Sequence, residues 1–469
     1  MPWSIDQGVH VCGSQGWLDR QVVQSFVLLN LLGGTCVTDI EKLESDAGLC
    51  AMVRRGEFAD MAPSLRRATQ RRFRSGRSRT FPAATQMYTF LESCHDEAQE
   101  QMRVAKTAFI PASNDALASL DGLNTHLLES VQRLRPCEEA TLDGDATIVS
   151  SETQTALFCY KGYRGWQPYN VWWDEQRMVL RSEFRDGNVP AGFEVTRVMK
   201  EAVACLPPGV KRVYTRQDTA AYQTDFLAWC EREREHPEYG RILFTVSADV
   251  TASLRSAVLA AQTWKPLRAK RNGRASAPER EWAELVFVPE AQALLSDIRE
   301  PFRYIAIRER MDDQLTLGEV DNQLPLPFPV ATMNNVRYKV HAIVTNRRED
   351  DAEELIRWHN GRCGRSEEAH AVMKYDFTGG RLPSAKFGAN AAWWALMILS
   401  MNFAMAFKRL ILGDPWVGKR MKALRFELIT TPGRIVQHAR QYCMRVSWRV
   451  QEWLAQLRAA VATLSPQSA

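Results

Sequence analysis

The sequence lacks the paired cysteines that bind structural zinc. Its ten cysteines are scattered singly between Cys12 and Cys443, and no two of them form a CxxC pair. A zinc ribbon is therefore not expected, because such sites place their thiolate ligands in closely spaced pairs. A chain of 469 residues can also bury a sizeable core without a disulfide framework, so we expect a reducing compartment.

Signals for export and for membrane insertion are also scarce. The start, MPWSIDQGVHVCGSQG, has no basic segment followed by an apolar run, so it does not resemble a signal peptide. Residues 390–407, NAAWWALMILSMNFAMAF, approach the length of a membrane span but hold two asparagines. We interpret this run as a buried core helix and expect no contact with a membrane.

Charge is small overall but unevenly distributed. The net charge is +5, yet residues 66–79, RRATQRRFRSGRSR, carry seven arginines and no acid. Residues 401–469 hold eleven Lys or Arg against three acids. Two basic regions around a near-neutral middle favour a polyanionic partner, above all nucleic acid. We expect phosphate contacts from Arg71, Arg72 and Arg74, which would give affinity and salt dependence but no sequence choice.

The pattern predicts helices first and strands afterwards. Apolar residues at spacings of three and four predict helices through residues 17–135. From Glu138 onwards the chain is rich in Val, Thr, Tyr and Trp with Gly turns, which is typical of three successive antiparallel strands. A helix, a short strand ending at Asp218 and another helix follow. This order of elements is that of the ribonuclease H-like fold, an inference from topology alone.

Two strand positions carry acids that are candidates for chemistry. Asp143 and Asp145 in LDGDAT alternate along a predicted strand and so point to one face, although Asp-Gly also favours turns. Asp218 directly follows an apolar strand, and open α/β sheets bind ligands at the carboxyl ends of their strands. An aspartate that caps the next helix would look the same.

A third candidate lies in HNGRCGRSEEAHAVMK, residues 359–374. We expect this segment on a long helix that starts near Asp350 or Asp351. Glu367 and Lys374 are seven residues apart, close to two helical turns, so they share a face. A solvated helix face with ordinary ion pairs would give the same pattern.

Together the three acids suit phosphodiester cleavage. A two-metal mechanism needs about three carboxylates to hold two divalent ions that clamp the attacking and leaving oxygens. Carboxylate oxygens suit hard ions, so we expect two Mg²⁺ ions, with Mn²⁺ as an alternative. The neighbouring cations Arg362, Arg365 and Lys374 would hold DNA phosphates.

Four pieces of the sequence resemble one family in order and in character. They are DGDAT with CYKGYRGWQPYNVWWDE, then TRQDTAAYQTDFLAWC, then AIVTNRREDDAEELIRWHN, and finally GRCGRSEEAHAVMKYDFTGGRLPSAKFGANAAWWALMILSMN. The chain resembles the DDE transposases of bacterial insertion sequences, in the group with a Tyr-Arg-Glu-Lys signature on the last catalytic helix. The resemblance spans roughly residues 143–402. It implies an α/β fold with a ribonuclease H-like mixed sheet flanked by helices and interrupted by a β-rich insertion.

The resemblance assigns roles by position. It makes Asp145, Asp218 and Glu367 the catalytic and metal-binding residues. Asp143 competes for the first place, and we prefer Asp145 because the family has a small residue and then Thr after the acid. Glu368 competes with Glu367, and the seven-residue distance to Lys374 favours Glu367.

The signature residues match in part. Lys374 matches the lysine, whereas Arg362 stands one residue further from Glu367 than the family pattern has its arginine. The tyrosine is absent, and His359 or Asn360 lies near its place; we expect His359 to contact phosphate together with Arg365.

The resemblance also implies an organisation and a function. The expected segments are a helical DNA-end-binding region at 1–135, the first part of the core at 136–235, the β-rich insertion at 236–335, the second part of the core at 336–405 and a basic helical tail at 406–469. The implied protein binds the terminal inverted repeats of a mobile element and target DNA, as a homodimer associated with the bacterial nucleoid in the cytoplasm, and catalyses cleavage and strand transfer. The alternatives are an inactive or truncated transposase-derived DNA-binding protein, since the family usually has more sequence before residue 20, and a nuclease that cuts without joining.

Overall fold

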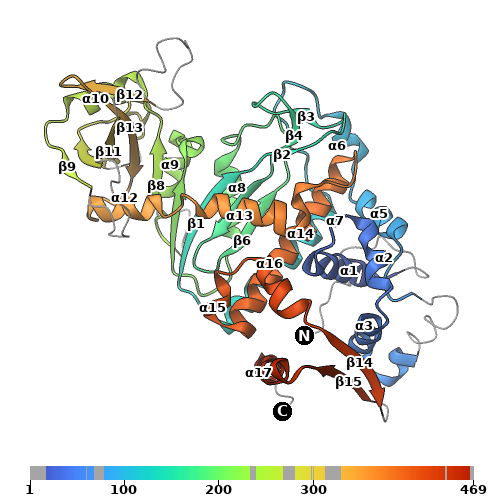
Figure 1. Cartoon of the computed structure of the whole chain (residues 1–469). Helices are drawn as coiled ribbons and strands as arrows, with labels where there is room; N and C mark the ends of the chain where they lie inside the picture. The colour runs from blue at the N-terminus through green and yellow to red at the C-terminus, as the bar shows by residue number, and fades with distance from the viewer. Residues whose placement is uncertain are drawn as a thin grey trace.

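A computed structural model describes residues 17–59, 61–67, 79–232, 239–267, 280–296, 298, 300–311, 329–438 and 441–464. Within these residues an N-terminal group of helices leads into a large mixed sheet, and a smaller C-terminal region follows (Figure 1). The predicted α/β class, with a mixed sheet flanked by helices, is confirmed.

The N-terminal region is helical, as the apolar spacing predicts. Its helices are α1 (Asp19–Leu32), η2 (Val37–Asp39), α2 (Ile40–Glu44), α3 (Ala47–Ala59), α5 (Ala84–Ser93), α6 (Glu97–Gln101) and α7 (Asp115–Leu134). Gly33 ends α1 with a φ of 92°, in the left-handed region that glycine adopts at low cost. The Asn114 side chain caps α7 by accepting the Leu117 N–H. One face of α7 buries leucines in the core.

Ten strands form the main sheet, and five consecutive strands at one end of it form its ribonuclease H-like part. These five are β6 (Met178–Glu183), β5 (Tyr169–Trp173), β1 (Glu139–Ala146), β7 (Arg212–Gln217) and β8 (Leu243–Ala248), in that order across the sheet. β1, β7 and β8 are parallel, whereas β5 is antiparallel to both of its neighbours. This is the ribonuclease H-like arrangement predicted from the order of elements.

The remaining strands extend the sheet beyond β8. They are β13 (Val336–Thr345), β11 (Arg303–Arg310), β10 (Arg280–Leu285) and β9 (Lys265–Pro266), with β12 (Val330–Met333) paired to β13, and all of these pairs are antiparallel. Together with α10 (Ala252–Ala260) and α11 (Glu290–Ala293) they form the lobe at the upper left of Figure 1. The predicted β-rich insertion begins at residue 236, but β8 lies after that residue and pairs with β7. The domain boundary at residue 236 stays a prediction.

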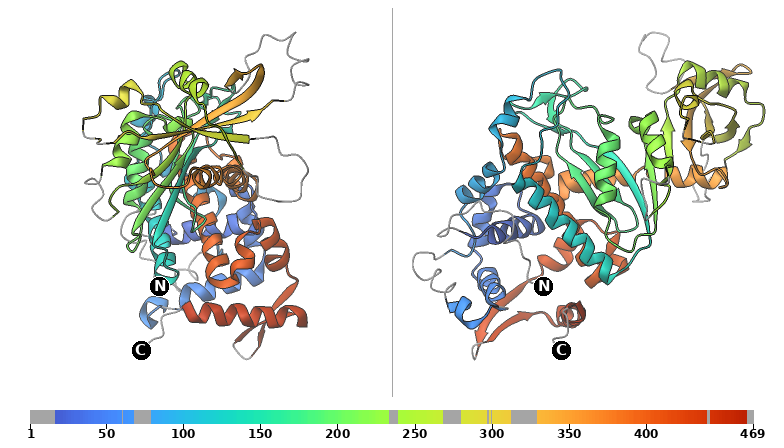
Figure 2. Two further views of the ribbon diagram at one scale, coloured as in Figure 1. Left: turned by 90° about the vertical axis from the view of Figure 1, so that its left-hand side faces the viewer. Right: turned by 180° about the vertical axis from the view of Figure 1, so that it is seen from behind.

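Helices cover both faces of the ribonuclease H-like strands. α7 and α8 (Val195–Ala204) lie on one face, toward the viewer in the right-hand view of Figure 2. η3 (Thr219–Ala221) and α9 (Thr224–Glu231) follow β7. α12 (Ala352–Asn360) and α13 (Arg365–Ala371) cross the opposite face, toward the viewer in Figure 1. The candidate acids lie beneath α13.

α14 (Phe387–Phe407) is the central helix of the molecule. It is apolar on all sides, and most of its side chains are buried against α1, α5, α7 and β6. By length and composition alone, Phe387–Leu412 would also qualify as a membrane span. The prediction of a buried core helix is confirmed by its packing.

Two parts of the fold before α14 differ from expectation. Residues 149–166 form a separate small sheet of β2 (Val149–Ser150), β4 (Arg164–Trp166) and β3 (Leu157–Phe158). The long helix expected from Asp350 or Asp351 is broken: α12 ends at Asn360, α13 begins at Arg365 and a π-helical turn, η6 (Val372–Asp376), follows. η7 (Thr378–Gly380) then leads to α14.

The C-terminal region is not wholly helical. It contains η8 (Lys408–Leu412), α15 (Asp414–Val417), α16 (Met421–Leu424), η9 (Arg425–Ile429) and α17 (Trp448–Leu464). Between η9 and α17 lies a two-stranded hairpin of β14 (Gly433–His438) and β15 (Gln441–Val446). Ile435, Val436 and Val446 are β-branched and favour strands at these positions.

Candidate active site

Four charged side chains lie on one face of β1 and β7. In the register of these parallel strands, Asp143 pairs with Arg216. Because side chains alternate along a strand, Asp145 shares the face of Asp143, and Asp218, just after β7, shares that of Arg216. The predicted common orientation of Asp143 and Asp145 is therefore confirmed, and the face they share lies under α12 and α13.

The break between α12 and α13 directs Arg362 toward these acids. A Cβ at Gly361 would lie 3.0 Å from the Trp358 carbonyl oxygen and 3.2 Å from Arg216 Nη1, so a side chain there would be crowded. Gly364 has a φ of +81°, which L-residues rarely adopt. The two glycines thus explain why the helix stops, and Arg362 lies in the turn between them instead of on a helix face.

Arg362 joins the two strand acids. Its Nη2 lies 3.5 Å from Asp145 Oδ2 and 3.4 Å from Asp218 Oδ2, and it donates to the Gly144 carbonyl at 3.1 Å. Asp218 also caps η3 by accepting the Ala220 N–H at 3.0 Å. Asp218 therefore follows the end of a strand and also caps the next helix, η3.

The Asp145 carboxylate has a raised pKa. Burial raises its pKa to about 6, an effect that the Arg362 charge opposes and the Asp218 charge adds to. A buried carboxylate near a second carboxylate is costly unless positive charge is close by. Arg362 supplies that charge, and Arg362 Nε is buried and has no hydrogen-bond partner among the described residues.

Asp143 has a different role from Asp145. It is buried, and Arg216 donates to both of its oxygens, from Nε at 2.8 Å and from Nη2 at 2.5 Å. Arg216 Nη1 also donates to the Trp358 carbonyl at 3.1 Å, and the guanidinium lies over the Trp358 ring. Asp143 is thus committed to an internal ion pair that ties β1 to β7 and to the end of α12.

The ion pair continues to the start of α13. Arg216 Nη2 lies 2.9 Å from Asp174 Oδ2, and Asp174, in the turn between β5 and β6, accepts from Arg365 at both of its oxygens. Asp143, Arg216, Asp174 and Arg365 therefore form one chain of charges, which we call the relay. Sequence analysis missed Arg216 and Asp174, although the period of two in Arg216-Gln217-Asp218 places Arg216 on the face of Asp218.

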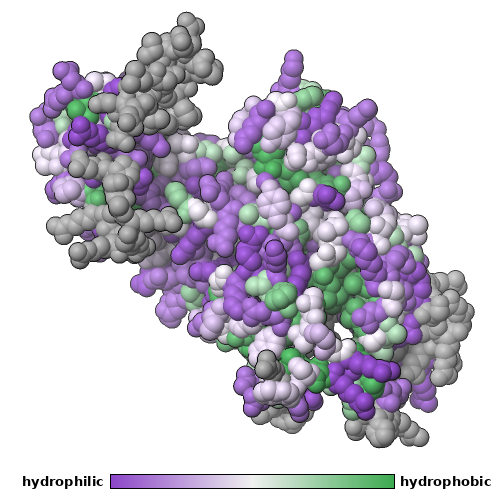
Figure 3. All heavy atoms as spheres, in the orientation of Figure 1, coloured by the Kyte–Doolittle hydropathy of each residue, from purple (hydrophilic) through white to green (hydrophobic). Residues whose placement is uncertain are grey.

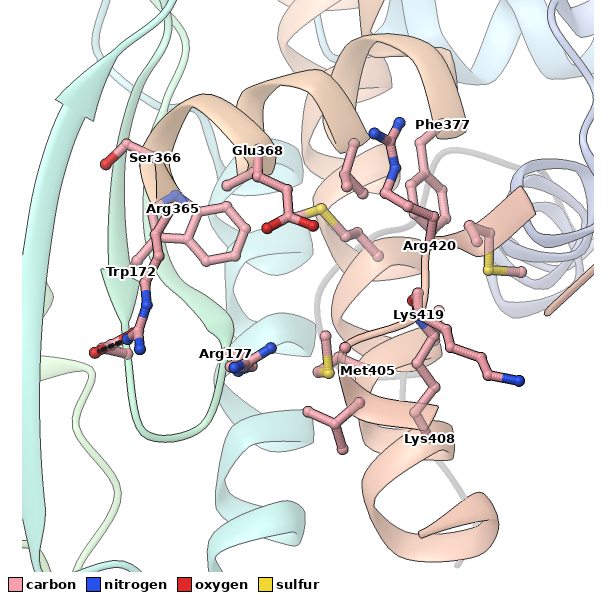
Figure 4. A pocket seen from close by; sticks show the side chains of 18 of the residues that line it. Trp172, Arg177, Arg365, Ser366, Glu368, Phe377, Met405, Lys408, Lys419 and Arg420 are labelled. Atoms are coloured by element: carbon pink, nitrogen blue, oxygen red, sulfur yellow. Dashed lines mark hydrogen bonds and ion pairs between the residues drawn. The ribbon is translucent and has the colours of Figure 1, made fainter. Parts of the chain in front are cut away.

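Glu367 and Glu368 have different surroundings. Glu368 lines a cavity of about 190 Å³ between α13 and the C-terminal region, together with Trp172, Arg365, Lys408 and Arg420 (Figure 4). Glu367 does not line this cavity and is exposed. It stands on the flank of α13 that continues to His370 and Lys374, and no contact joins it to Asp145 or Asp218 in the described part of the chain. Hydrophilic side chains dominate the surface over this part of the molecule (Figure 3).

The residues predicted to bind phosphate differ in burial and in their partners. Lys374 is half-buried, and its Nζ donates to the Ile148 carbonyl at 2.7 Å, just after β1. Arg365 is half-exposed but paired with Asp174. Arg71, Arg72 and Arg74 lie outside the described residues.

His359 requires a correction. It is buried, and its two ring nitrogens lie 2.8 Å from Thr245 Oγ1 and 3.0 Å from Ser247 Oγ, both on β8. Burial lowers its pKa to about 3, so the ring is neutral at physiological pH. A buried, neutral and fully hydrogen-bonded imidazole cannot contact DNA phosphate, and we do not carry that role forward.

The carboxylates of Asp145 and Asp218 suit a hard cation, although no third acid joins them among the described residues. Among the described residues, no group of three or more His, Cys, Asp and Glu side chains is placed to hold a metal ion. Asp145 and Asp218 nevertheless direct carboxylate oxygens at one positive group. A divalent cation at this place would offset the burial cost of Asp145, so these two acids fit the group that the resemblance implies.

The fold and these acids together define a class of protein. Aspartates on adjacent parallel strands of a ribonuclease H-like sheet, facing a helix that carries a glutamate, are typical of enzymes that act on phosphodiester bonds of nucleic acid. Residues 18–466 match the family described as Transposase DDE domain group 1, and the chain belongs to this family of transposases.

One solved structure extends the comparison. The chain is similar to a cryo-EM structure of the piggyBac transposase synaptic complex with hairpin DNA, with 9% sequence identity and a TM-score of 0.37, over 96% of this chain and 86% of that one. No curated protein matches the chain.

Proposed function

We propose that this protein binds the inverted-repeat ends of a mobile element and catalyses DNA cleavage and strand transfer. The observation that carries the proposal is the convergence of Asp145 and Asp218 on Arg362, from neighbouring parallel strands, beneath the helix of Glu367. Membership of a DDE transposase family supports the same chemistry.

The proposed division of labour follows from the geometry. Asp145 and Asp218 would hold Mg²⁺, with Glu367 as the third acid. When bound, such an ion activates the attacking oxygen and stabilises charge on the leaving oxygen. Arg362 already lies between the two aspartates, so it would position a scissile phosphate there. Lys374 and Arg365 would hold the flanking backbone, and we expect double-stranded DNA and a second copy of the chain as partners in the cytoplasm.

The test compares adjacent glutamates on one helix. We expect magnesium-dependent nicking of inverted-repeat DNA to be lost in Glu367→Gln and retained in Glu368→Gln, because Glu368 lines the cavity that Asp143 and Asp174 also line, whereas Glu367 does not. Asp145→Asn and Asp143→Asn form a second pair, in which only the first removes a candidate ligand. The reverse pattern in either pair would move the site to the other acid.

The same assay separates the alternatives. An inactive DNA-binding protein would bind the inverted repeat without nicking it in magnesium or manganese. A nuclease would nick but would give no strand-transfer product with a target plasmid. The proposal requires both nicked and joined products, each dependent on Asp218.

A further inference from the structure

An exposed hairpin between β3 and β4 plays no part in the chemistry proposed above. Its tip is closed by two backbone hydrogen bonds, from the Gly162 N–H to the Cys159 carbonyl at 3.0 Å and from the Cys159 N–H to the Tyr163 carbonyl at 2.9 Å. Gly162 has a φ of +83°, as the last residue of such a three-residue loop requires. The loop is therefore tight, with Tyr160 and Lys161 at its end.

The base of this hairpin is firmly anchored. Trp166 is wholly buried and packs against Phe184 and Phe387. Arg164 Nη1 donates to the carbonyls of Gln154 at 2.9 Å and Ala156 at 2.7 Å. Arg164 is thus occupied within the protein, and the tip is held in a fixed position.

The tip exposes aromatic rings to solvent. Tyr160, Phe158 and Tyr163 are 78%, 57% and 40% exposed. Lys161 lies beside the Tyr160 ring, with its Nζ 5.8 Å from the ring centre. Exposed aromatic side chains held rigidly are unfavourable in water unless a partner covers them. Rings interleaved with cations are the combination that binds unpaired nucleotides, because bases stack on the rings while the cations hold the backbone.

The hairpin lies next to the candidate active site. β2, which pairs with β4, begins three residues after the end of β1. Lys374 reaches the Ile148 carbonyl in this short connection. Burial lowers the pKa of Lys374, and the Lys161 charge lowers it further. Neither lysine has a carboxylate partner within the described ranges, and a cation without such a partner favours an anionic ligand.

We propose that the tip of this hairpin binds unpaired nucleotides of the DNA beside the cleavage position, with the backbone phosphate held by Lys161 and bases stacked on Tyr160 and Tyr163. This inference rests on the proposed function, since the DNA is the substrate of the same site. Intact duplex does not account for the exposed rings, because the faces of paired bases are already stacked on one another. Cations alone would suffice for duplex backbone.

The experiment compares two DNA probes. One is a short labelled blunt duplex, and the other is the same duplex with an oligothymidine extension; affinities are measured by fluorescence anisotropy in magnesium-free buffer. We expect Tyr160→Ala to weaken binding of the extended probe by roughly five- to a hundredfold, the range for loss of one or more stacked bases, with little effect on the blunt duplex. Tyr160→Phe keeps the ring and should bind like the wild type. Bromodeoxyuridine in the extension should crosslink to residues 157–164.

A matched control and a salt series complete the design. Phe426, in η9 of the C-terminal region, is 80% exposed, so Phe426→Ala removes an equally exposed ring and should change neither affinity. Lys161→Gln should weaken the extended probe and reduce the salt dependence of its binding.

The outcomes distinguish this inference from the proposed function. If Tyr160→Ala binds both probes like the wild type, or binds both more weakly to the same extent, stacking on unpaired nucleotides is wrong, and nicking of inverted-repeat DNA by the wild-type protein would leave the proposed function standing. If wild-type protein binds neither probe and nicks nothing, the proposed function itself fails.

Discussion

At the scale of single residues, the contrast between Asp143 and Asp145 shows how partners assign roles. The two aspartates stand two residues apart on one strand and share a face, yet only Asp143 is held by two hydrogen bonds from a buried arginine. Asp145 has weaker contacts to Arg362, at 3.5 Å, and keeps a pKa of about 6 because of burial. Asp143 therefore ties β1 to β7, whereas Asp145 is the one of the two that we propose as a metal ligand.

Arg216 is the residue through which this construction can be tested. Lysine keeps the charge but has no planar fork, so Arg216→Lys cannot hold Asp143, Asp174 and the Trp358 carbonyl together. We expect a loss of about 2 kcal/mol in the free energy of unfolding, the range for hydrogen bonds to charged groups, and a fall in the nicking rate at saturating DNA. DNA affinity should change little, because Arg216 is buried.

Arg212 offers the control on the same strand. It pairs with Glu139 at the exposed end of β7, where ion pairs contribute little. Arg212→Lys should therefore leave stability and nicking unchanged. A nicking rate in Arg216→Lys equal to that of Arg212→Lys would show that the relay supports the fold without positioning α13.

At the scale of elements, the break between α12 and α13 is the feature on which the site depends. Gly364 has a φ of +81° but open space around it, so only the backbone conformation selects glycine there. Gly364→Ala should cost about 1 kcal/mol in stability, the penalty of a side chain in the left-handed region. We expect a larger relative loss of nicking, because relieving the strain shifts Arg362 and α13 together. Gly418→Ala, with a φ of −82° and equally open space, is the control and should be neutral in both urea unfolding and nicking.

The same break marks the limit of what the sequence alone could predict. Local periodicity sufficed for the shared face of Asp143 and Asp145 and for the strand end at Asp218. The position of Arg362 depends on backbone crowding at Gly361 by Arg216, which comes from a strand some 145 residues earlier. His359 was predicted at the surface for the same reason: its partners, Thr245 and Ser247, are distant in sequence. Contacts of this kind arise only once the sheet has formed.

At the scale of the whole molecule, α14 closes the open edge of the sheet. In the part of the chain that the structure describes, β6 is the last strand on its side, so its outward backbone groups face no neighbouring strand there. The Asn402 side chain takes that place: its Oδ1 accepts the Val179 N–H at 2.9 Å and its Nδ2 donates to the Val179 carbonyl at 2.7 Å. Asn124 of α7 receives the other Nδ2 hydrogen, at 2.7 Å. One buried amide therefore joins the sheet to the helical N-terminal region, and its polarity is the reason that this apolar helix carries an asparagine.

Removing that amide should weaken the assembly of sheet and helices as a unit. Asn402→Ala leaves the Val179 N–H buried without an acceptor, which costs about 1–3 kcal/mol in addition to the hydrogen bonds lost, so we expect a total loss of about 2–4 kcal/mol in urea unfolding. Ser400→Ala is the matched control, because Ser400 is equally buried on α14 but bonds only to Leu396 of its own helix. Tryptophan fluorescence and far-UV circular dichroism should report one shared transition at lower urea in Asn402→Ala and an almost unchanged one in Ser400→Ala. Equal losses in the two variants would mean that apolar packing alone holds α14 on the sheet, and separate transitions would mean that the helical region folds independently of it.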